Sequence, residues 1–382
     1  MQLPPLGLYI HLPWCERKCP YCDFNSHEID TLPEQQYVEA LLKDLRRDSH
    51  LIADRELQTI FIGGGTPSLF SPSSIERLFT GISEALNIAP NLEATMEANP
   101  GSAEADKFKS FAQAGINRLS LGIQSFDDKC LSALGRVHDS AAAHRAVEYA
   151  QAAGFDSLNL DLMHGLPGQS PEAASADLAA AIEHAPEHLS WYQLTIEPNT
   201  VFYKQPPSLP NEDNLADIQQ AGEYAIRAAG FEQYEVSAFS KPGYRCRHNL
   251  NYWRFGDYLG IGAGAHAKLR LADGSVQRTA KRRQPDDYLN IAGGQERGYI
   301  ANSRLLEKDD LVGEFMLNAL RLNEGFATEL FSAATGLALE TLEPALSTLV
   351  SQGLLAQEND RISATATGRR FLNDVVARFF PD

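Results

Sequence analysis

Residues 8–22 read LYIHLPWCERKCPYC, and this stretch joins an apolar run to a cluster of thiols. The run Leu8–Leu12 is rich in branched and aromatic side chains, which favours a buried strand. Directly after it, Cys15, Cys19 and Cys22 fall within one short loop. Reactive side chains that follow a strand at once are typical of the carboxyl end of a parallel strand, where α/β folds place their sites.

The same order of strand and then helix repeats down the first 240 residues. The predicted strands are Leu8–Leu12, Thr59–Ile62, Ala94–Glu97, Arg118–Ile123, Ser157–Leu162, Leu189–Leu194 and Gln233–Ser237. Helical periodicity marks Pro33–Arg47, Ser73–Leu86, Ala103–Ala114, Ser140–Ala153, Pro171–His184 and Asp213–Ala229. This order implies parallel strands with right-handed crossovers. It therefore predicts an α/β fold with a partial (β/α)6, TIM-like barrel rather than a doubly wound sheet.

The last third of the chain has a different pattern. A hairpin is expected around Asp273-Gly274, and amphipathic helices broken by glycines fill Lys308–Asp382. We expect a barrel core over residues 1–240, a linking region with a hairpin over 241–305, and a small, mainly helical, winged-helix-like domain over 306–382.

Composition narrows the class of protein. The 33 Lys and Arg stand against 50 Asp and Glu, so the net charge of −17 argues against nucleic acid as a partner. Charged residues, Pro and Gly interrupt every apolar run, and Met1–Trp14 lacks the pattern of a signal peptide. The five cysteines are too unevenly spaced for a disulfide framework. These features predict a cytoplasmic protein whose clustered thiols bind metal or react.

Three thiolates can hold three corners of a cubane iron–sulfur cluster and leave the fourth iron open to a ligand. A closed zinc site needs four ligands, usually in paired hooks, and the second hook is missing here. His11 or Asp23 is a candidate fourth ligand, so a zinc-stabilised scaffold stays as an alternative. We interpret Cys130 and Cys246 as core residues.

The cysteine loop, the aromatic Tyr21 and the loop Gly63-Gly64-Gly65-Thr66-Pro67 resemble the radical S-adenosylmethionine superfamily, and the whole chain resembles its coproporphyrinogen dehydrogenase branch. The resemblance implies a radical SAM barrel and a C-terminal domain typical of this branch. It also implies a 4Fe-4S cluster on Cys15, Cys19 and Cys22, whose open iron takes the amino and carboxylate groups of S-adenosylmethionine.

Further contacts to S-adenosylmethionine are implied by positions that match the family at successive strand ends. Consecutive glycines expose backbone N–H groups, carboxylates suit ribose hydroxyls or an ammonium, and an arginine suits a carboxylate. The matching residues are Tyr9, Tyr21, Gly64, Gly65, Thr66, Glu97, Gln124, Arg136 and Asp161.

Two departures from the dehydrogenases count against oxygen-independent coproporphyrinogen III oxidation, which we keep as an alternative. Phe24 stands where those enzymes have a fourth cysteine, and only 14 residues precede Cys15. Instead, residues 248–253 match the H-N-x-x-Y-W motif of heme chaperones related to this branch. The match implies binding of heme by His248, Tyr252 and Trp253, with His248 at the iron, and transfer of heme to an acceptor protein.

Two remaining motifs are interpreted without a ligand of their own. The glycine-rich stretch 260–265 has no convincing strand before it, so we interpret it as a tight loop near the site rather than a dinucleotide fingerprint. The basic residues Arg278, Lys281, Arg282 and Arg283 are typical of a solvated face. Contact of this basic run with propionates or an anionic membrane surface is a hypothesis, as is a homodimer.

Overall fold

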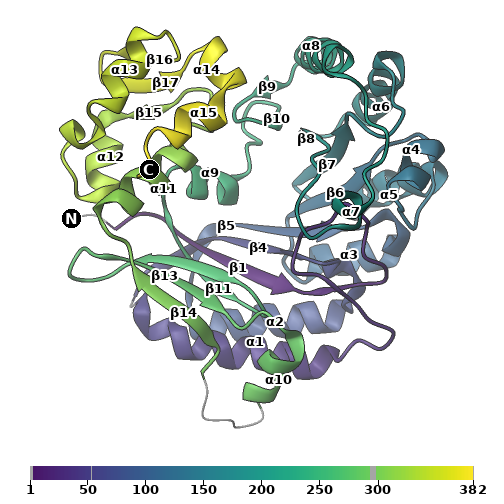
Figure 1. The fold of residues 1–382 in the computed structure, drawn as a ribbon. Helices are drawn as coiled ribbons and strands as arrows, with labels where there is room; N and C mark the ends of the chain where they lie inside the picture. The colour runs from purple at the N-terminus through teal and green to yellow at the C-terminus, as the bar shows by residue number, and fades with distance from the viewer. Residues whose placement is uncertain (1–2, 53, 293–297, 382) are drawn as a thin grey trace.

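The computed structural model describes residues 3–52, 54–292 and 298–381, and one curved sheet dominates it (Figure 1). Within the described residues this sheet has 12 strands in the order β14-β13-β12-β11-β1-β4-β5-β6-β7-β8-β10-β9. No described helix combines the length and the apolar character that a membrane span requires.

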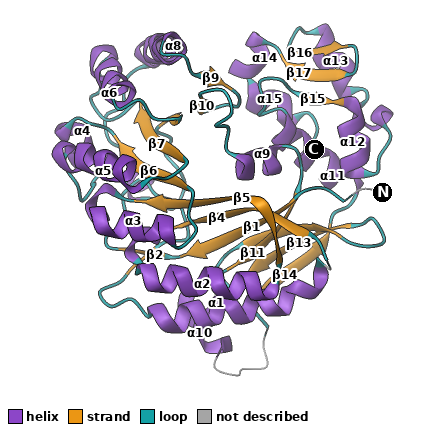
Figure 2. Cartoon of the chain, turned by 180° about the vertical axis from the view of Figure 1, so that it is seen from behind, coloured by secondary structure: helices purple, strands orange, loops and turns teal. Residues whose placement is uncertain are grey.

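The middle of the sheet is parallel and confirms the predicted partial barrel. Its strands are β1 (Leu6–Leu12), β4 (Glu56–Gly64), β5 (Asn87–Ala98), β6 (Arg118–Gln124), β7 (Ser157–His164) and β8 (His188–Gln193), each parallel to the next. The crossover helices include α1 (Glu34–Asp48), α2 (Pro72–Ala85), α3 (Ala105–Gln113), α5 (Ser140–Ala153), α6 (Pro171–Glu183) and α8 (Glu212–Ala228). Figure 2 shows α1 and α2 covering the outer face of the sheet.

Local sequence explains these elements. The side chains of Leu6, Leu8, Ile10 and Leu12 are at most 1% exposed, because β1 lies in the centre of the sheet with both faces covered. Asp139 caps the N-terminus of α5 by accepting a hydrogen bond from the Ala142 amide. Gly154 ends α5 in the left-handed conformation, at a φ of 82°.

The predicted strand Gln233–Ser237 is wrong. The chain instead forms two short strands, β9 (Glu232–Gln233) and β10 (Ala238–Ser240), and both run antiparallel at this edge of the sheet. The amide of Tyr234 donates to the carbonyl of Ala238 and closes the reversal between them. A reversal of this kind leaves no room for a further parallel strand at this edge of the sheet.

The segment 241–305, expected as a linking region, extends the main sheet. It forms α9 (Arg247–Trp253), β11 (Asp257–Ile261), β12 (His266–Arg270), β13 (Val276–Lys281), α10 (Pro285–Ala292) and β14 (Ile300–Leu305). β11 pairs in parallel with β1, and β12 and β13 form the hairpin predicted around Asp273. The stretch 260–265 therefore does follow a strand, contrary to our interpretation, but the next element is the strand β12 and not a helix.

The C-terminal region packs around a core of its own. Its helices are α11 (Lys308–Ala319), α12 (Thr328–Thr335), α13 (Ala345–Ser351), α14 (Ala366–Arg370) and α15 (Leu372–Ala377). β15 (Phe326–Ala327), β16 (Leu355–Glu358) and β17 (Arg361–Ala364) form a small antiparallel sheet, as a winged-helix-like domain requires. Phe315, Phe326 and Phe331 meet edge to face in this core. Figure 1 shows α9 lying between this region and the main sheet.

Candidate functional site

The cysteine loop is held at both ends by short strands. β2 (Trp14–Cys15) and β3 (His27–Glu28) pair in parallel, and the amide of Ile29 donates to the carbonyl of Cys15. Within the loop the amide of Cys22 donates to the carbonyl of Cys19 across 3.1 Å. All three thiols are free, with Cys15 buried and the other two half-buried. These contacts hold the backbone of the loop.

The surroundings of the sulfur atoms suit thiolates that bind iron. The Arg136 guanidinium donates to the Cys19 Sγ at 3.5 Å, and the Ser26 hydroxyl lies 3.7 Å from the Cys22 Sγ. Burial raises the pKa of the Cys15 and Cys22 thiols, which favours their protonated form. A cationic cluster reverses this preference, because metal coordination deprotonates a thiol.

The zinc alternative lacks a fourth ligand. The His11 Nε2 donates to the carbonyl of Asn25 at 2.8 Å, and the Tyr9 hydroxyl bonds the His11 Nδ1 at 2.9 Å, so neither ring nitrogen is available. The side chain of Asp23 is exposed. Within the described ranges no three His, Cys, Asp or Glu side chains converge on one ion position. A cubane cluster needs only three thiolates from the protein, which is the number that this loop supplies.

The sequence suggested that the glycine loop exposes free backbone amides, but the amides of Gly64, Gly65 and Thr66 are hydrogen-bonded within the protein. The Gly64 amide donates to Glu97 Oε2 at 3.2 Å, the Gly65 amide to the Leu12 carbonyl and the Thr66 amide to the Trp14 carbonyl. A Cβ on Gly65 would lie 2.4 Å from the Trp14 carbonyl oxygen. These glycines therefore let the end of β4 pack tightly beneath the cysteine loop.

Two half-buried carboxyl groups, those of Glu97 and Asp161, lie close enough at the strand ends to interact electrostatically, and we call them the acidic pair. Burial, and then the nearby Asp161, raises the pKa of Glu97 to about 8. Asp161 accepts hydrogen bonds from the Ser120 hydroxyl and the Asn159 amide, while burial raises its pKa. Neither carboxyl group forms a salt bridge within the described part of the chain. The acidic pair suits a cationic ligand, and S-adenosylmethionine carries both a sulfonium and an ammonium.

Gln124 is the last residue of β6, and Arg136 lies in the loop after α4 (Asp128–Ala133). The Arg136 Nη2 donates to the Gly122 carbonyl at 2.8 Å, and its Nε has no hydrogen-bond partner among the described residues. Gln124 adopts the left-handed region at a φ of 67°, and the Tyr192 hydroxyl donates to its Oε1 at 2.8 Å. Tyr21 lies beside Arg136 and packs on Phe202.

Tyr192 is a site residue that the sequence analysis missed. Its hydroxyl holds Gln124, and its ring is an electrostatic neighbour of Asp161, Arg136 and Glu97. Tyr192 lies on β8, one residue before this strand ends at Gln193, and was interpreted only as part of a buried run. Because alternate residues of a strand face one side, extending the alternation from Ser190 to Tyr192 would have found it.

The heme motif is folded against the barrel strands. His248 is 1% exposed, with Thr59 Oγ1 at 2.8 Å from its Nδ1 and the Tyr252 hydroxyl at 2.8 Å from its Nε2. Its ring lies 5.3 Å from that of Phe61, which in turn stacks on Tyr9 at 6.4 Å. Burial lowers the pKa of His248 to about 3, so the imidazole is neutral. Neither ring nitrogen is free for iron while α9 holds this position.

Tyr252 and Trp253 line a cavity of about 190 Å³ between α9, β11–β13 and α11, together with Tyr258, Lys268, Arg278 and Asn318. The Trp253 indole N–H is buried and has no hydrogen-bond partner in the described residues. The Arg321 guanidinium lies 4.3 Å above the Trp253 ring.

The basic run is not the solvated face that we expected. The Lys281 ammonium is buried and contacts Asp44 at 2.6 Å and Asp48 at 2.5 Å. The Arg278 guanidinium pairs with Glu314 of α11. These pairs tie β13 to α1 and to the C-terminal domain, so two members of the run are structural.

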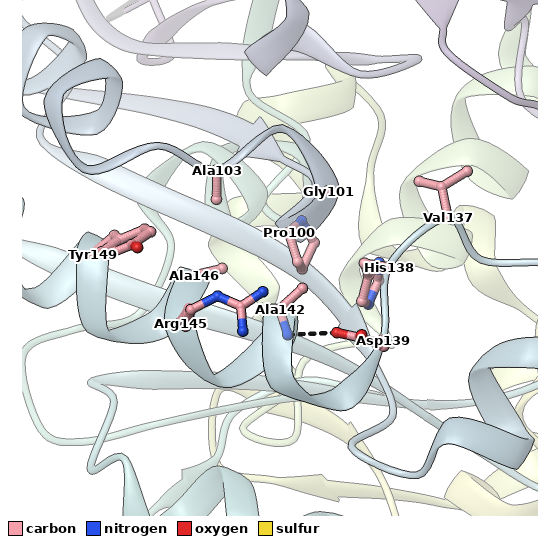
Figure 3. Close-up of a pocket in the computed structure, with 10 residues that line it drawn as sticks. All are labelled: Pro100, Gly101, Ala103, Val137, His138, Asp139, Ala142, Arg145, Ala146 and Tyr149. Carbon is pink, nitrogen blue, oxygen red and sulfur yellow. Dashed lines mark hydrogen bonds between the residues drawn. The ribbon is translucent and has the colours of Figure 1, made fainter.

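The two remaining cysteines are buried, as interpreted. Cys130 lies on α4 and packs with Leu134 and Met163, and Cys246 is the residue before α9. A cavity of about 290 Å³ lies elsewhere, between the turn at Pro100–Ser102 and the start of α5, with His138 and Arg145 among its lining (Figure 3). None of the predicted site residues lines this cavity.

Comparisons with known proteins agree with this geometry. A model of the radical SAM superfamily matches residues 9–179, and a model of the HemN C-terminal domain matches residues 306–371. The chain is 49% identical to heme chaperone HemW of Escherichia coli, with 100% of each chain covered. It is 34% identical to heme chaperone HemW of Bacillus subtilis, covering 97% of this chain and 98% of that protein.

A mouse protein named radical S-adenosyl methionine domain-containing protein 1, mitochondrial, is 37% identical over 84% of this chain and 74% of its own length. Among solved structures, coproporphyrinogen III oxidase HemN of Escherichia coli superposes with a TM-score of 0.83 at 24% identity. The superposition covers 99% of this chain and 90% of that chain, and it shows a shared fold.

Proposed function

The chain belongs to the heme chaperone HemW family within the radical SAM superfamily, and from this premise we propose that it binds heme and transfers it to an acceptor protein. The observation that carries the proposal is the position of α9. This helix presents residues 248–253 to the barrel strands on one side and to the C-terminal domain on the other. A ligand bound there is sensed by both parts of the chain.

The proposed cofactors are a 4Fe-4S cluster on Cys15, Cys19 and Cys22 and an exchangeable S-adenosylmethionine beside the acidic pair of Glu97 and Asp161. When bound, such a cluster would supply an open iron for the amino and carboxylate groups of S-adenosylmethionine. The Arg136 guanidinium donates to the Cys19 Sγ and to the Gly122 carbonyl, so its positive charge would attract the carboxylate of a ligand beside the cysteine loop. Tyr9, Tyr21, Gly64, Gly65, Thr66 and Gln124 complete the proposed contacts.

We assign the heme iron to His248, with the rings of Tyr252 and Trp253 against the porphyrin. This assignment requires α9 to release one ring nitrogen of His248, since both are hydrogen-bonded in the described fold. A neutral imidazole is the form that ligates iron, and the low pKa of His248 provides it without loss of a proton.

The proposal is tested by anaerobic titration of heme into the cluster-loaded protein, followed by absorbance. Saturation at one heme per chain is expected for the wild type, with weaker binding and a changed spectrum for His248→Ala. The matched control is His188→Ala, because His188 is equally buried and its nitrogens also contact an amide oxygen and a tyrosine hydroxyl. Equal loss in both variants would mean that folding, and not the iron, is affected.

Absence of saturable binding in the wild type overturns the heme proposal. Turnover of coproporphyrinogen III is then the function to assay, although Phe24 is exposed where the dehydrogenases carry a cysteine. We further propose that the protein works in the cytoplasm, as clustered reduced thiols favour. We also propose a homodimer, which sedimentation tests. Contact of Arg282 and Arg283 with an anionic membrane surface is tested by binding to anionic vesicles.

A further inference from the structure

A row of cationic side chains crosses the outer strands of the sheet opposite α9. Tyr258 of β11 pairs in register with Lys268 of β12, Lys268 with Arg278 of β13, and Arg278 with Arg304 of β14. Residues directly opposite each other in neighbouring strands have their side chains on one face. Three like charges in such a row destabilise the sheet unless carboxylates or a ligand offset them.

Carboxylates of α11 offset the outer half of the row. Glu314 accepts hydrogen bonds from the Nε of Arg278 at 2.8 Å and from Arg304 at 3.1 Å. Asp310 forms a salt bridge with Arg304 at 2.8 Å. The two arginines are therefore fully paired by the C-terminal domain.

The inner cation, Lys268, is offset much less. Its ammonium donates to the backbone carbonyl of Phe255 at 2.8 Å and lies 3.9 Å from the centre of the Phe255 ring, whereas the nearest carboxylate oxygen, of Asp257, lies 3.6 Å away. Asp257 is closer to Arg55, at 2.9 Å. Around the row, four cations thus face three carboxylates, and the unbalanced positive charge is nearest to Lys268.

Burial makes this imbalance costly. The Lys268 side chain is 3% exposed, and burial lowers its pKa to about 7 despite the attraction of Asp257. In a chain with a net charge of −17, a buried and poorly paired ammonium stands out. An anion placed beside it would restore the charged form.

There is room for such an anion at this point. Lys268 and Arg278 line the cavity of about 190 Å³ that Tyr252, Trp253 and Tyr258 also line. Pockets that enclose a whole drug-sized ligand have roughly 300–1,000 Å³, so this cavity takes one arm of a larger molecule. The Trp253 indole N–H, unpartnered within the described residues, is a second buried donor beside the cavity.

We propose that the cavity binds a carboxylate arm of a flat conjugated ligand, namely a propionate of heme, with Lys268 as its counter-ion. The rings of Tyr252 and Trp253 flank the apolar stem of the arm, and the carboxylate completes the offset of the cationic row. The inference rests on the proposed function and assigns it a subsite. Because Asn318 of α11 also lines the cavity, a bound propionate contacts the barrel and the C-terminal domain together.

The test compares heme with heme dimethyl ester, whose propionates are uncharged. On the wild type, we expect the diester to bind about tenfold more weakly or worse, as expected for loss of a charge-assisted contact. On Lys268→Met, heme should fall to the affinity of the diester, while the diester itself is unchanged. Lys241→Met is the matched control, because the Lys241 ammonium also donates to a backbone carbonyl and lies over a phenylalanine ring.

Equal affinity of heme and the diester for the wild type would overturn the subsite, and this comparison needs no variant to fold. Equal weakening of both ligands by Lys268→Met would also overturn it, because a charge effect must be confined to heme. If the wild type binds neither ligand, the proposed function itself fails, so the two failures are distinguishable.

Discussion

Substitution of Tyr252 by Phe separates stability from heme binding. In the wild type the Tyr252 hydroxyl bonds the His248 Nε2 at 2.8 Å inside a protein core. The variant keeps the ring but leaves a buried nitrogen without a partner, which costs about 1–3 kcal/mol in the free energy of unfolding. If iron takes this nitrogen, heme no longer has to displace the hydroxyl. The same energy then reappears as an affinity about 5- to 150-fold higher than in the wild type.

The assay pairs urea unfolding of the apoprotein with anaerobic heme titration of the cluster-loaded protein. Tyr234→Phe is the control, because the Tyr234 hydroxyl bonds the Nε2 of the buried His188 at 2.8 Å outside the heme motif. The control should lose stability with no gain in heme affinity. Lower stability of Tyr252→Phe together with unchanged or weaker heme binding would refute the assignment of iron to the His248 Nε2.

The remaining predictions concern the cluster, the acidic pair of Glu97 and Asp161, and a buried ion pair. Cys15→Ser should lower iron and inorganic sulfide per chain to background, because two thiolates cannot retain the cluster. In the apoprotein, Glu97 keeps its proton up to about pH 8 when folded, so the free energy of unfolding should fall from about pH 5 to pH 8. Glu97→Gln should remove most of that slope in urea titrations. Lys281→Met should lower the free energy of unfolding by about 3–5 kcal/mol, because Asp44 and Asp48 lose their buried counter-charge.

Each of these predictions has an internal control. Cys130→Ser alters a buried thiol remote from the loop and should keep iron and sulfide intact. Arg227→Gln removes an exposed helical ion pair and should cost less than about 1 kcal/mol. A pH slope that survives in Glu97→Gln would assign it to another group, such as Asp161. A small loss in Lys281→Met would mean that the carboxyl group of Asp44, whose pKa burial raises to about 6, is protonated in the native protein at the pH of the assay.

The barrel was predictable because its signals are local. Apolar runs, capping residues and glycines located the six parallel strands and their helices to within a few residues, except that β5 begins at Asn87 and not at Ala94. The edges were not predictable, because no local signal says that β11 pairs with β1 across 250 residues of sequence. The failure at Gln233–Ser237 has the same origin: strand-forming residues there are used in a reversal at a sheet edge.

The site was predictable in its members but not in their partners. Sequence motifs selected Glu97, Asp161 and His248. They did not show that the two carboxyl groups lie near each other, or that both ring nitrogens of the histidine are hydrogen-bonded inside the protein. The glycine loop illustrates the reason. Its amides were expected to face a ligand. Instead the carbonyls of Leu12 and Trp14 accept the Gly65 and Thr66 amides, and Glu97 accepts the Gly64 amide, so all three partners lie far away in the sequence.

The heme motif and the cofactor site are built on the same two strands. β1 carries Tyr9 six residues before Cys15, and β4 carries Phe61 two residues before the glycine loop. His248 packs on Phe61, and Phe61 stacks on Tyr9, whose hydroxyl bonds His11 under the cysteine loop. A release of His248 toward iron therefore removes packing from the strands that position the cluster loop. A shift of His248 on heme binding is therefore expected to change the packing of Phe61 and Tyr9, on the two strands that lead to the glycine loop and the cysteine loop.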